Sequence, residues 1–512
     1  MRLLYLSILA VYLAPPLLLA LYLPRAPLDV LERIRLDWIL AWTIAQASAS
    51  ATISVLLGLP VGIAAAWYGS RAARAWRILG LPVFMAPSVS VVLGFRALAE
   101  YGLAPGWAAR APWGIIVVHS YYNIPLSAVL SYSSIAWVAG ELVDYVESLG
   151  LRGWRLWRRV LLPAALPGAM AAWLLAFTYS FTGLAAPLMV EGAAYKYYTL
   201  EAWIYTLYWG FPAWRLSAAV LSILQSGLLL VLAYALLRYT ERREHVEAPA
   251  PAKAGRLGAA LLEAYSLTLL AALYAPLASV VAYSLVDPYT GRVTLEAYER
   301  LFHGPLPLPP GASAAKSIAW SIFYATATSM LATISSLTPA LGGRARRLAS
   351  LAPLTVSPVI AGVGLHLTLY HPLSTRIGHT ATVVLLIVLT HTAIAVPLAS
   401  RALELGIRRI PREALDYLAS LPLSPWRHAL LILASAGPGT VAAALLSAVS
   451  SLGEFGAALV ITEPSTWSLG VLTYNLYSAG RLLHVASASA TILLALTLAA
   501  TAAAASRLKQ WF

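Results

Sequence analysis

The residues that could do chemistry in this 512-residue sequence are few and widely spaced. The sequence has no cysteine, which excludes a thiolate nucleophile, a thiolate metal site and a disulfide. It has no Gly-x4-Gly-Lys-Ser/Thr phosphate loop and no His-Glu-x-x-His zinc motif, and its nine histidines are scattered. We therefore expect no enzymatic activity, no cofactor and no metal site in this chain.

A small set of polar residues falls within or beside long apolar segments, where an ionisable group is costly and is a functional candidate by default. Glu454 lies between glycines, and His119 and His391 occupy equivalent positions in two similar segments. With Thr182 and Ser450, these residues are candidates for lining a solute pathway. The alternative interpretations are a structural hydrogen bond for Glu454 and ordinary helix packing for the two histidines.

The composition indicates which kind of structural elements position these residues. Hydrophobic residues make up 60% of the chain and charged residues 11%, against roughly 25% charged in an ordinary soluble protein. The net charge of +14 comes from short basic clusters between apolar runs. That pattern is typical of membrane orientation rather than of nucleic-acid binding, so we expect a lipid bilayer and no nucleic acid among the partners.

Apolar windows long enough to cross a bilayer occur along the whole chain, since a crossing needs roughly 20 helical residues. They are 3–23, 42–68, 77–98, 113–138, 162–190, 213–237, 257–286, 317–341, 348–370, 380–400, 433–462 and 481–506. The sequence therefore predicts an all-α integral membrane protein with about twelve transmembrane helices. Alternate loops contain 23 of the 35 Lys and Arg residues, which predicts a multi-pass plasma-membrane protein with both termini in the cytoplasm.

The chain contains an internal repeat at an offset of about 272 residues. His119 and Pro125 recur as His391 and Pro397, and the dipeptide at 144–145 recurs at 416–417. The repeat predicts two homologous six-helix halves in the same orientation, a parallel internal repeat. We expect a first half at 1–238, a cytoplasmic linker at 239–256 and a second half at 257–512.

The loop between the fourth and fifth windows, residues 141–160, is the most informative segment. Acidic residues begin it, Gly150 lies in its middle and four arginines end it, which predicts a short helix, a glycine turn and an amphipathic helix that enters the membrane. Such a surface can bind another protein. The alternative is a basic helix that simply lies on anionic lipid.

The spacing Asp144-x5-Gly150-x9-Val160-x2-Pro163 resembles the Glu-Ala-Ala loop of ABC importer permeases. Loop 413–432 is a second copy that departs from the family pattern, with Pro422 in place of the glycine. In the family this loop docks onto a cytoplasmic ATPase. The resemblance therefore implies coupling residues in both loops: Asp144, Glu147, Gly150, Arg152, Val160, Pro163, Glu413, Asp416, Pro422 and Ile432.

This resemblance implies a binding-protein-dependent type I permease in a fused two-half form, similar to thiamine or iron(III) permeases. Segments 199–205 and 212–225 are similar to thiamine permeases in particular. The implied partners are two copies of an ATP-binding subunit and an extracytoplasmic solute-binding protein. That protein would meet an outer mouth formed by loops 99–112, 191–212, 287–316 and 463–480. Thiamine or iron(III) is the expected solute, and an oxyanion or a polyamine comes next.

Two other function classes stay open from the sequence. An ion-coupled secondary transporter would also fit twelve helices in two halves, but it needs a relay of buried carboxylates, of which only Glu454 lies well inside a predicted crossing. A membrane enzyme acting on lipid pyrophosphates would need clustered acidic motifs at a membrane face, and none occurs in the sequence.

Overall fold

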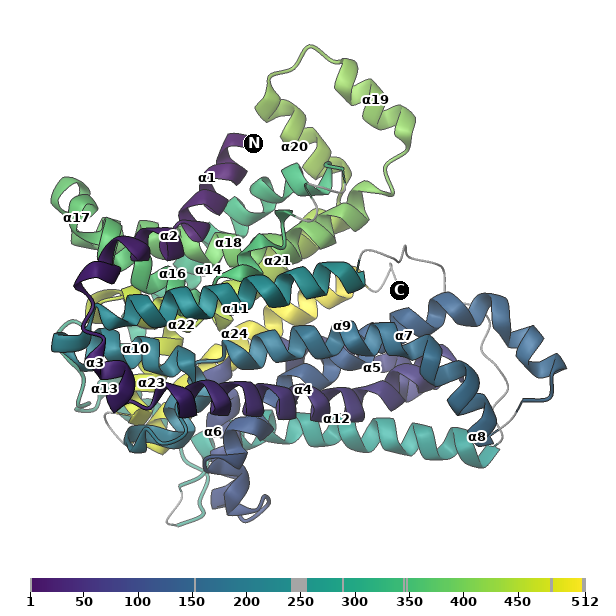
Figure 1. Cartoon of the computed structure of the whole chain (residues 1–512), viewed down its shortest axis with the longest axis horizontal. Helices are drawn as coiled ribbons and strands as arrows, with labels where there is room; N and C mark the ends of the chain where they lie inside the picture. The colour runs from purple at the N-terminus through teal and green to yellow at the C-terminus, as the bar shows by residue number, and fades with distance from the viewer. Residues whose placement is uncertain are drawn as a thin grey trace.

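The computed structural model describes residues 2–151, 153–240, 256–287, 290–343, 346, 349–478 and 482–508. In this part of the chain the structure is helical, and the only β-pairing is an isolated bridge between Val286 and Val293. Figure 1 shows long helices lying side by side, with the α19–α20 and α7–α8 segments projecting from them. The predicted all-α membrane class is therefore confirmed.

The helices follow the apolar windows, with additional short elements between them. In the first half they are α1 Arg2–Leu13, α2 Pro15–Leu19, η1 Ala20–Arg25, α3 Asp29–Arg33, α4 Leu36–Ala66, α5 Arg71–Phe84, α6 Ser88–Glu100, η2 Gly106–Ala109, α7 Trp113–Ser148, α8 Gly153–Leu156, η3 Trp157–Leu161, α9 Leu162–Phe181, η4 Pro187–Glu191, α10 Leu200–Gly210 and α11 Ser217–Thr240. In the second half they are α12 Arg256–Leu285, α13 Glu296–His303, α14 Ala314–Ala340, η7 Ala352–Thr355, α16 Pro358–Leu365, η8 His366–Tyr370, α17 His371–Ile377, α18 His379–Ile407, α19 Arg412–Ser420, α20 Pro425–Ser435, α21 Pro438–Gly453, α22 Gly456–Ile461, α23 Leu469–Ser478 and α24 Leu483–Leu508. Most of the expected linker, residues 241–255, lies outside the described residues.

Nine helices in the described ranges are long and apolar enough to cross a membrane, or eleven if each of two bent pairs counts as one span. The expected number of twelve is not confirmed. The bends are 93° between α5 and α6 and 97° between α20 and α21. Window 348–370 contains three short elements, η7, α16 and η8, in place of one long helix. Mean hydropathy over a window does not register such breaks, which coincide here with Pro87, Pro358 and Pro438.

Equivalent hydrogen bonds occur in the two halves. The indole of Trp42 donates to the carbonyl oxygen of Tyr197 at 2.7 Å, and the indole of Trp320 donates to that of Ser465 at 2.8 Å. In both halves a long helix, α4 or α14, thereby fixes the segment that leads into a short buried helix, α10 or α23.

The residue that follows each of these tryptophans, Thr43 or Ser321, anchors the short helix itself. The hydroxyl of Thr43 accepts a hydrogen bond from the backbone N–H of Leu200 at 2.9 Å, and the hydroxyl of Ser321 accepts one from Leu469 at 2.8 Å. The repeated sequence thus builds the same local structure twice, and α10 and α23 are equivalent elements.

The two halves exchange their first helices. Helices α1 and α2 pack on α14, α16 and α18 of the second half, and α12 packs on α4, α5 and α6 of the first half. The contacts are close: a Cβ atom added at Gly94 would overlap the backbone carbonyl of Pro276, and one added at Gly364 would overlap Pro15. Because of this exchange, neither half completes its packing without the other.

Candidate functional site

A cavity of about 590 Å³ lies between the two halves, within the range expected for a small-molecule site. Its lining comes largely from places where helices break. These are residues 84–88 between α5 and α6, 182–186 after α9, 351–358 before α16, and 449–456 between α21 and α22. Side chains from α1, α7, α9, α10 and α18 complete the wall. Interrupted helices around a central cavity are a common way to place polar groups within a membrane protein.

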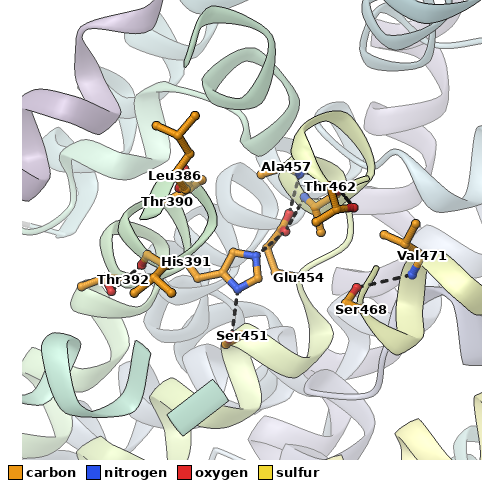
Figure 2. A network of polar contacts seen from close by, with 12 residues as sticks. Leu386, Thr390, His391, Thr392, Ser451, Glu454, Ala457, Thr462, Ser468 and Val471 are labelled. Atoms are coloured by element: carbon orange, nitrogen blue, oxygen red, sulfur yellow. Dashed lines mark hydrogen bonds and ion pairs between the residues drawn. The ribbon is translucent and has the colours of Figure 1, made fainter. Parts of the chain in front are cut away.

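Glu454 lines this cavity and is held by a complete set of hydrogen bonds (Figure 2). The backbone changes from helical to extended at Glu454, where α21 ends, and the carboxylate faces the beginning of α22. It accepts bonds from the backbone N–H groups of Ala457 and Ala458 at 2.9 and 3.1 Å and lies 2.9 Å from Nε2 of His391. The hydroxyl of Ser451 lies 2.8 Å from the other ring nitrogen. This arrangement supports a structural hydrogen-bonding role for Glu454.

His119 has different partners from its counterpart. Its Nδ1 atom lies 2.8 Å from the side-chain oxygen of Gln46, whose amide nitrogen donates to the carbonyl of Ser180 at 2.9 Å. At the offset of 272 that relates the two histidines, the residue corresponding to Glu454 is Thr182. The next residue, Gly183, leaves room for the imidazole, because a Cβ there would overlap Nε2 of His119. The two histidines therefore share a position without sharing a chemical environment.

Four of the five candidate pathway residues line the cavity: His119, Thr182, Ser450 and Glu454. His391 is 1% exposed and lies behind Glu454 rather than at the surface of the cavity. The pattern of polar residues in apolar segments thus marked positions that the fold brings together from both halves.

Sequence reasoning missed Glu201, a second buried carboxylate on the cavity. Glu201 is fully buried in the first turn of α10, and its Oε2 atom accepts a hydrogen bond from the amide of Gln225. Its Oε1 atom has no hydrogen-bond partner among the described residues. The sequence placed Glu201 in an outer loop, 191–212. In the structure this part of the loop is the buried helix α10. The available signal was an acidic residue two positions after the N-cap Thr199 in an otherwise apolar segment.

Loop 141–160 has the predicted glycine turn and the second helix, whereas the predicted short first helix is the end of a much longer one. Helix α7 continues to Ser148, the chain turns at 149–150, and α8 and η3 lead into α9. Gly150 is exposed and adopts φ +66°, and no heavy atom lies within 4 Å of a Cβ built there. Val160 is half-buried in η3, and Pro163 is exposed in the first turn of α9. Asp144 and Glu147 belong to α7, and Arg152 lies outside the described residues.

Loop 413–432 also forms two helices, α19 and α20, which Figure 1 shows projecting from the body. Nε2 of His428 lies 2.7 Å from the carbonyl oxygen of Leu418 and ties the two helices together. The loop exposes two aromatic residues, Tyr417 at 65% and Trp426 at 49%. The expected coupling residues are exposed at Glu413, Asp416 and Pro422 and half-buried at Ile432.

Residues 58–246 match the family described as the binding-protein-dependent transport system inner membrane component. This region contains loop 141–160 and the first half's share of the cavity wall except Tyr12.

Individual relatives are permease proteins of three transport systems. The spermidine/putrescine permease PotC of Haemophilus influenzae is 25% identical over 148 residues, which is 29% of this chain and 56% of the relative. The molybdenum permease ModB of Mycobacterium tuberculosis is 28% identical, over 31% of this chain and 69% of the relative. The thiamine permease ThiP of Haemophilus influenzae is 26% identical, over 33% of this chain and 34% of the relative. The chain thus spans about half the length of PotC and a third of ThiP.

Proposed function

We propose that this chain, which resembles the type I permeases of ABC importers, is the transmembrane subunit of an ATP-driven importer for a small solute. The observation that carries the proposal is the pair of projecting helix–turn–helix loops, one at the corresponding place in each half. A transport subunit of this kind needs no chemistry of its own, because ATP hydrolysis belongs to a separate partner.

The partners follow from the two loops and the cavity. Two copies of a cytoplasmic ATP-binding subunit would engage loops 141–160 and 413–432, through the coupling residues named from the sequence. The exposed rings of Tyr417 and Trp426 give loop 413–432 the aromatic surface that protein interfaces favour. ATP-driven closure of those subunits would draw the loops together and tilt the two halves. The permease itself needs only two conformations of similar free energy.

The membrane arrangement is part of the same proposal. Segments 1–238 and 257–512 would form the two halves, the linker 239–256 and both termini would lie in the cytoplasm, and the protein would reside in the plasma membrane. An extracytoplasmic solute-binding protein would deliver its solute to the opposite side. His119, Thr182, Ser450 and Glu454 would face the pathway, with His391 supporting Glu454.

Thiamine or iron(III) is the proposed solute, with an oxyanion or a polyamine as the next candidates. The relatives support thiamine through ThiP, a polyamine through PotC and an oxyanion through ModB. The choice among them depends on the chemistry of the cavity.

Purification of the tagged chain from its native membranes in mild detergent tests the proposal. Mass spectrometry should identify a co-purifying subunit with a phosphate-loop ATPase sequence, and deletion of residues 141–160 should reduce its recovery. The untagged membranes provide the background control. Recovery of the chain without any ATPase, together with solute uptake driven by an ion gradient alone, would instead establish a secondary transporter.

A further inference from the structure

We propose that the central cavity is selective for an organic cation and that Glu201 recognises its positive charge. This inference rests on the proposed function, since it names the class of solute that the same cavity would pass.

The cavity wall offers hydrogen-bond acceptors that have no partner. Among the described residues, neither Oε1 of Glu201 nor Oδ1 of Asn123 has one, although the two residues are 0% and 2% exposed and line the cavity. The amide of Asn123 is oriented by its nitrogen, which donates to the carbonyl of His119 at 2.8 Å and to Ser180 Oγ at 3.3 Å. A buried acceptor left unpaired is costly, and a ligand that carries N–H donors or positive charge would satisfy both oxygens.

Several hydrogen-bond donors of the wall are used within the protein. The hydroxyls of Thr178 and Thr182 donate to backbone carbonyls of their own helix at 2.8 and 2.9 Å. Arg401, the only arginine on the described wall, donates from Nη1 to Glu404 at 3.0 Å, and 56% of its side chain is exposed. The hydroxyl of Tyr122 is a free donor among the described residues, but the arginine of the wall is already ion-paired, and charge-assisted donors are the ones that bind oxyanions strongly.

The charges around the cavity favour a cation as well. Four titratable or charged residues other than tyrosine line it: His119, Glu201, Arg401 and Glu454. The carboxylate of Glu454 is compensated by His391 and by the N-terminus of α22, and Arg401 is paired with Glu404. Glu201 has only neutral neighbours among the described residues: the amide of Gln225 donates to it, and the Ser357 hydroxyl and the Val359 backbone N–H face its carboxylate. It is therefore the acidic group of the described wall that has no cationic side chain as a partner.

Aromatic rings on the wall indicate an organic cation. Tyr12, Tyr122 and Tyr179 line the cavity, and Tyr179 is 40% exposed. Aromatic faces attract ammonium groups, with about 0.5–2 kcal/mol per contact. By contrast, the described residues contain no group of three or more His, Cys, Asp or Glu that could hold a metal ion.

The repeat shows that the shared fold does not require this carboxylate. The equivalent short helix α23 begins with Leu469 bonded to Ser321, as α10 begins with Leu200 bonded to Thr43. The residue after Leu469 is Gly470, whereas the residue after Leu200 is Glu201. The second half builds the same helix without an acidic residue, so a function of Glu201 in ligand binding explains it better than a requirement of the fold.

Equilibrium binding to the full chain, purified with its co-purifying subunits and placed in lipid nanodiscs, tests the proposal. The probes are radiolabelled thiamine, spermidine and molybdate. We expect at least one of the two cations to bind and molybdate not to bind. Glu201→Gln should weaken cation binding tenfold or more while the thermal midpoint stays unchanged. Glu263→Gln makes the same chemical change at a carboxylate outside the cavity, bonded to Ser70 and the N-terminus of α5, and should leave binding unchanged.

A second variant keeps the test decisive if Glu201→Gln fails to fold. Thr182→Lys would place a positive charge on the half-buried wall and should abolish cation binding. Binding of molybdate, or of neither cation at 1 mM, would overturn the cation assignment, whereas recovery of the ATPase subunit in the same preparation would leave the importer assignment intact. Loss of the ATPase subunit would count against the proposed function separately.

Discussion

The imidazole of His391 lies 2.9 Å from the carboxylate of Glu454 and joins α18 to the beginning of α22. Both side chains are buried, and the carboxylate also accepts two backbone N–H bonds. The first half keeps the histidine, as His119, but has Thr182 at the position that corresponds to Glu454. The two halves thus share a backbone plan and differ in the charges that they bring to the cavity.

Glu454→Ala should destabilise the protein markedly. It removes the acceptor for two backbone N–H groups and for His391, and we expect a loss of about 3 kcal/mol in the free energy of unfolding. Glu454→Gln should cost less, because its carbonyl oxygen still accepts. The midpoints of thermal unfolding in detergent provide the comparison, and equal midpoints for Glu454→Ala and the unmodified chain would contradict the structural role.

Gly150→Glu should abolish coupling while leaving the fold intact. No heavy atom lies near a Cβ at this position, so the side chain projects into the space that a partner would occupy. Its positive φ adds strain of about 1–2 kcal/mol. Gly378→Glu is the matched control, because Gly378 also has a positive φ and open surroundings but lies between α17 and α18. ATPase recovery and ATP-driven uptake should fall for Gly150→Glu alone, and normal uptake by that variant would remove the coupling assignment.

The exchanged helices should not tolerate added volume at their crossing points. Gly94→Ala and Gly364→Ala would push α12 and α2 away from α6 and α16, at a cost of about 1–3 kcal/mol each. Gly227→Ala in α11 meets open space and should be neutral or stabilising by up to about 1 kcal/mol, since alanine is the better helix former. Thermal midpoints should separate the first two variants from the third.

The two halves should assemble when produced as separate chains. Residues 1–245 and 246–512 each present a first helix that packs on the other, so we expect the pieces to co-purify through a tag on one of them. A first piece shortened to residues 26–245 lacks α1 and α2 and should recover clearly less of its partner. Equal recovery by the long and short pieces would show that the exchange contributes little to assembly.

The sequence predicted those features that local patterns determine. Apolar windows located the long helices, the repeat placed His119 and His391 at equivalent positions, and the glycine in loop 141–160 predicted the turn at Gly150. The number of spans was harder to predict, because a window average merges α5 with α6 and conceals the three elements of 348–370. Glu201 was missed for a related reason. Helix α10 has 11 residues, too few to register as a crossing, and tertiary packing alone buries it.

Glu201 has no acidic counterpart in the second half, where the equivalent helix has Gly470 at the corresponding position. In a symmetric homodimer every substitution appears on both walls, so the two walls cannot carry different acidic groups. Joining the halves in one polypeptide removes that constraint, because each wall can change independently. The cavity therefore holds two unlike carboxylates, Glu201 bonded to an amide on one wall and Glu454 bonded to an imidazole on the other, so that one of them can be tuned for a solute without altering the other.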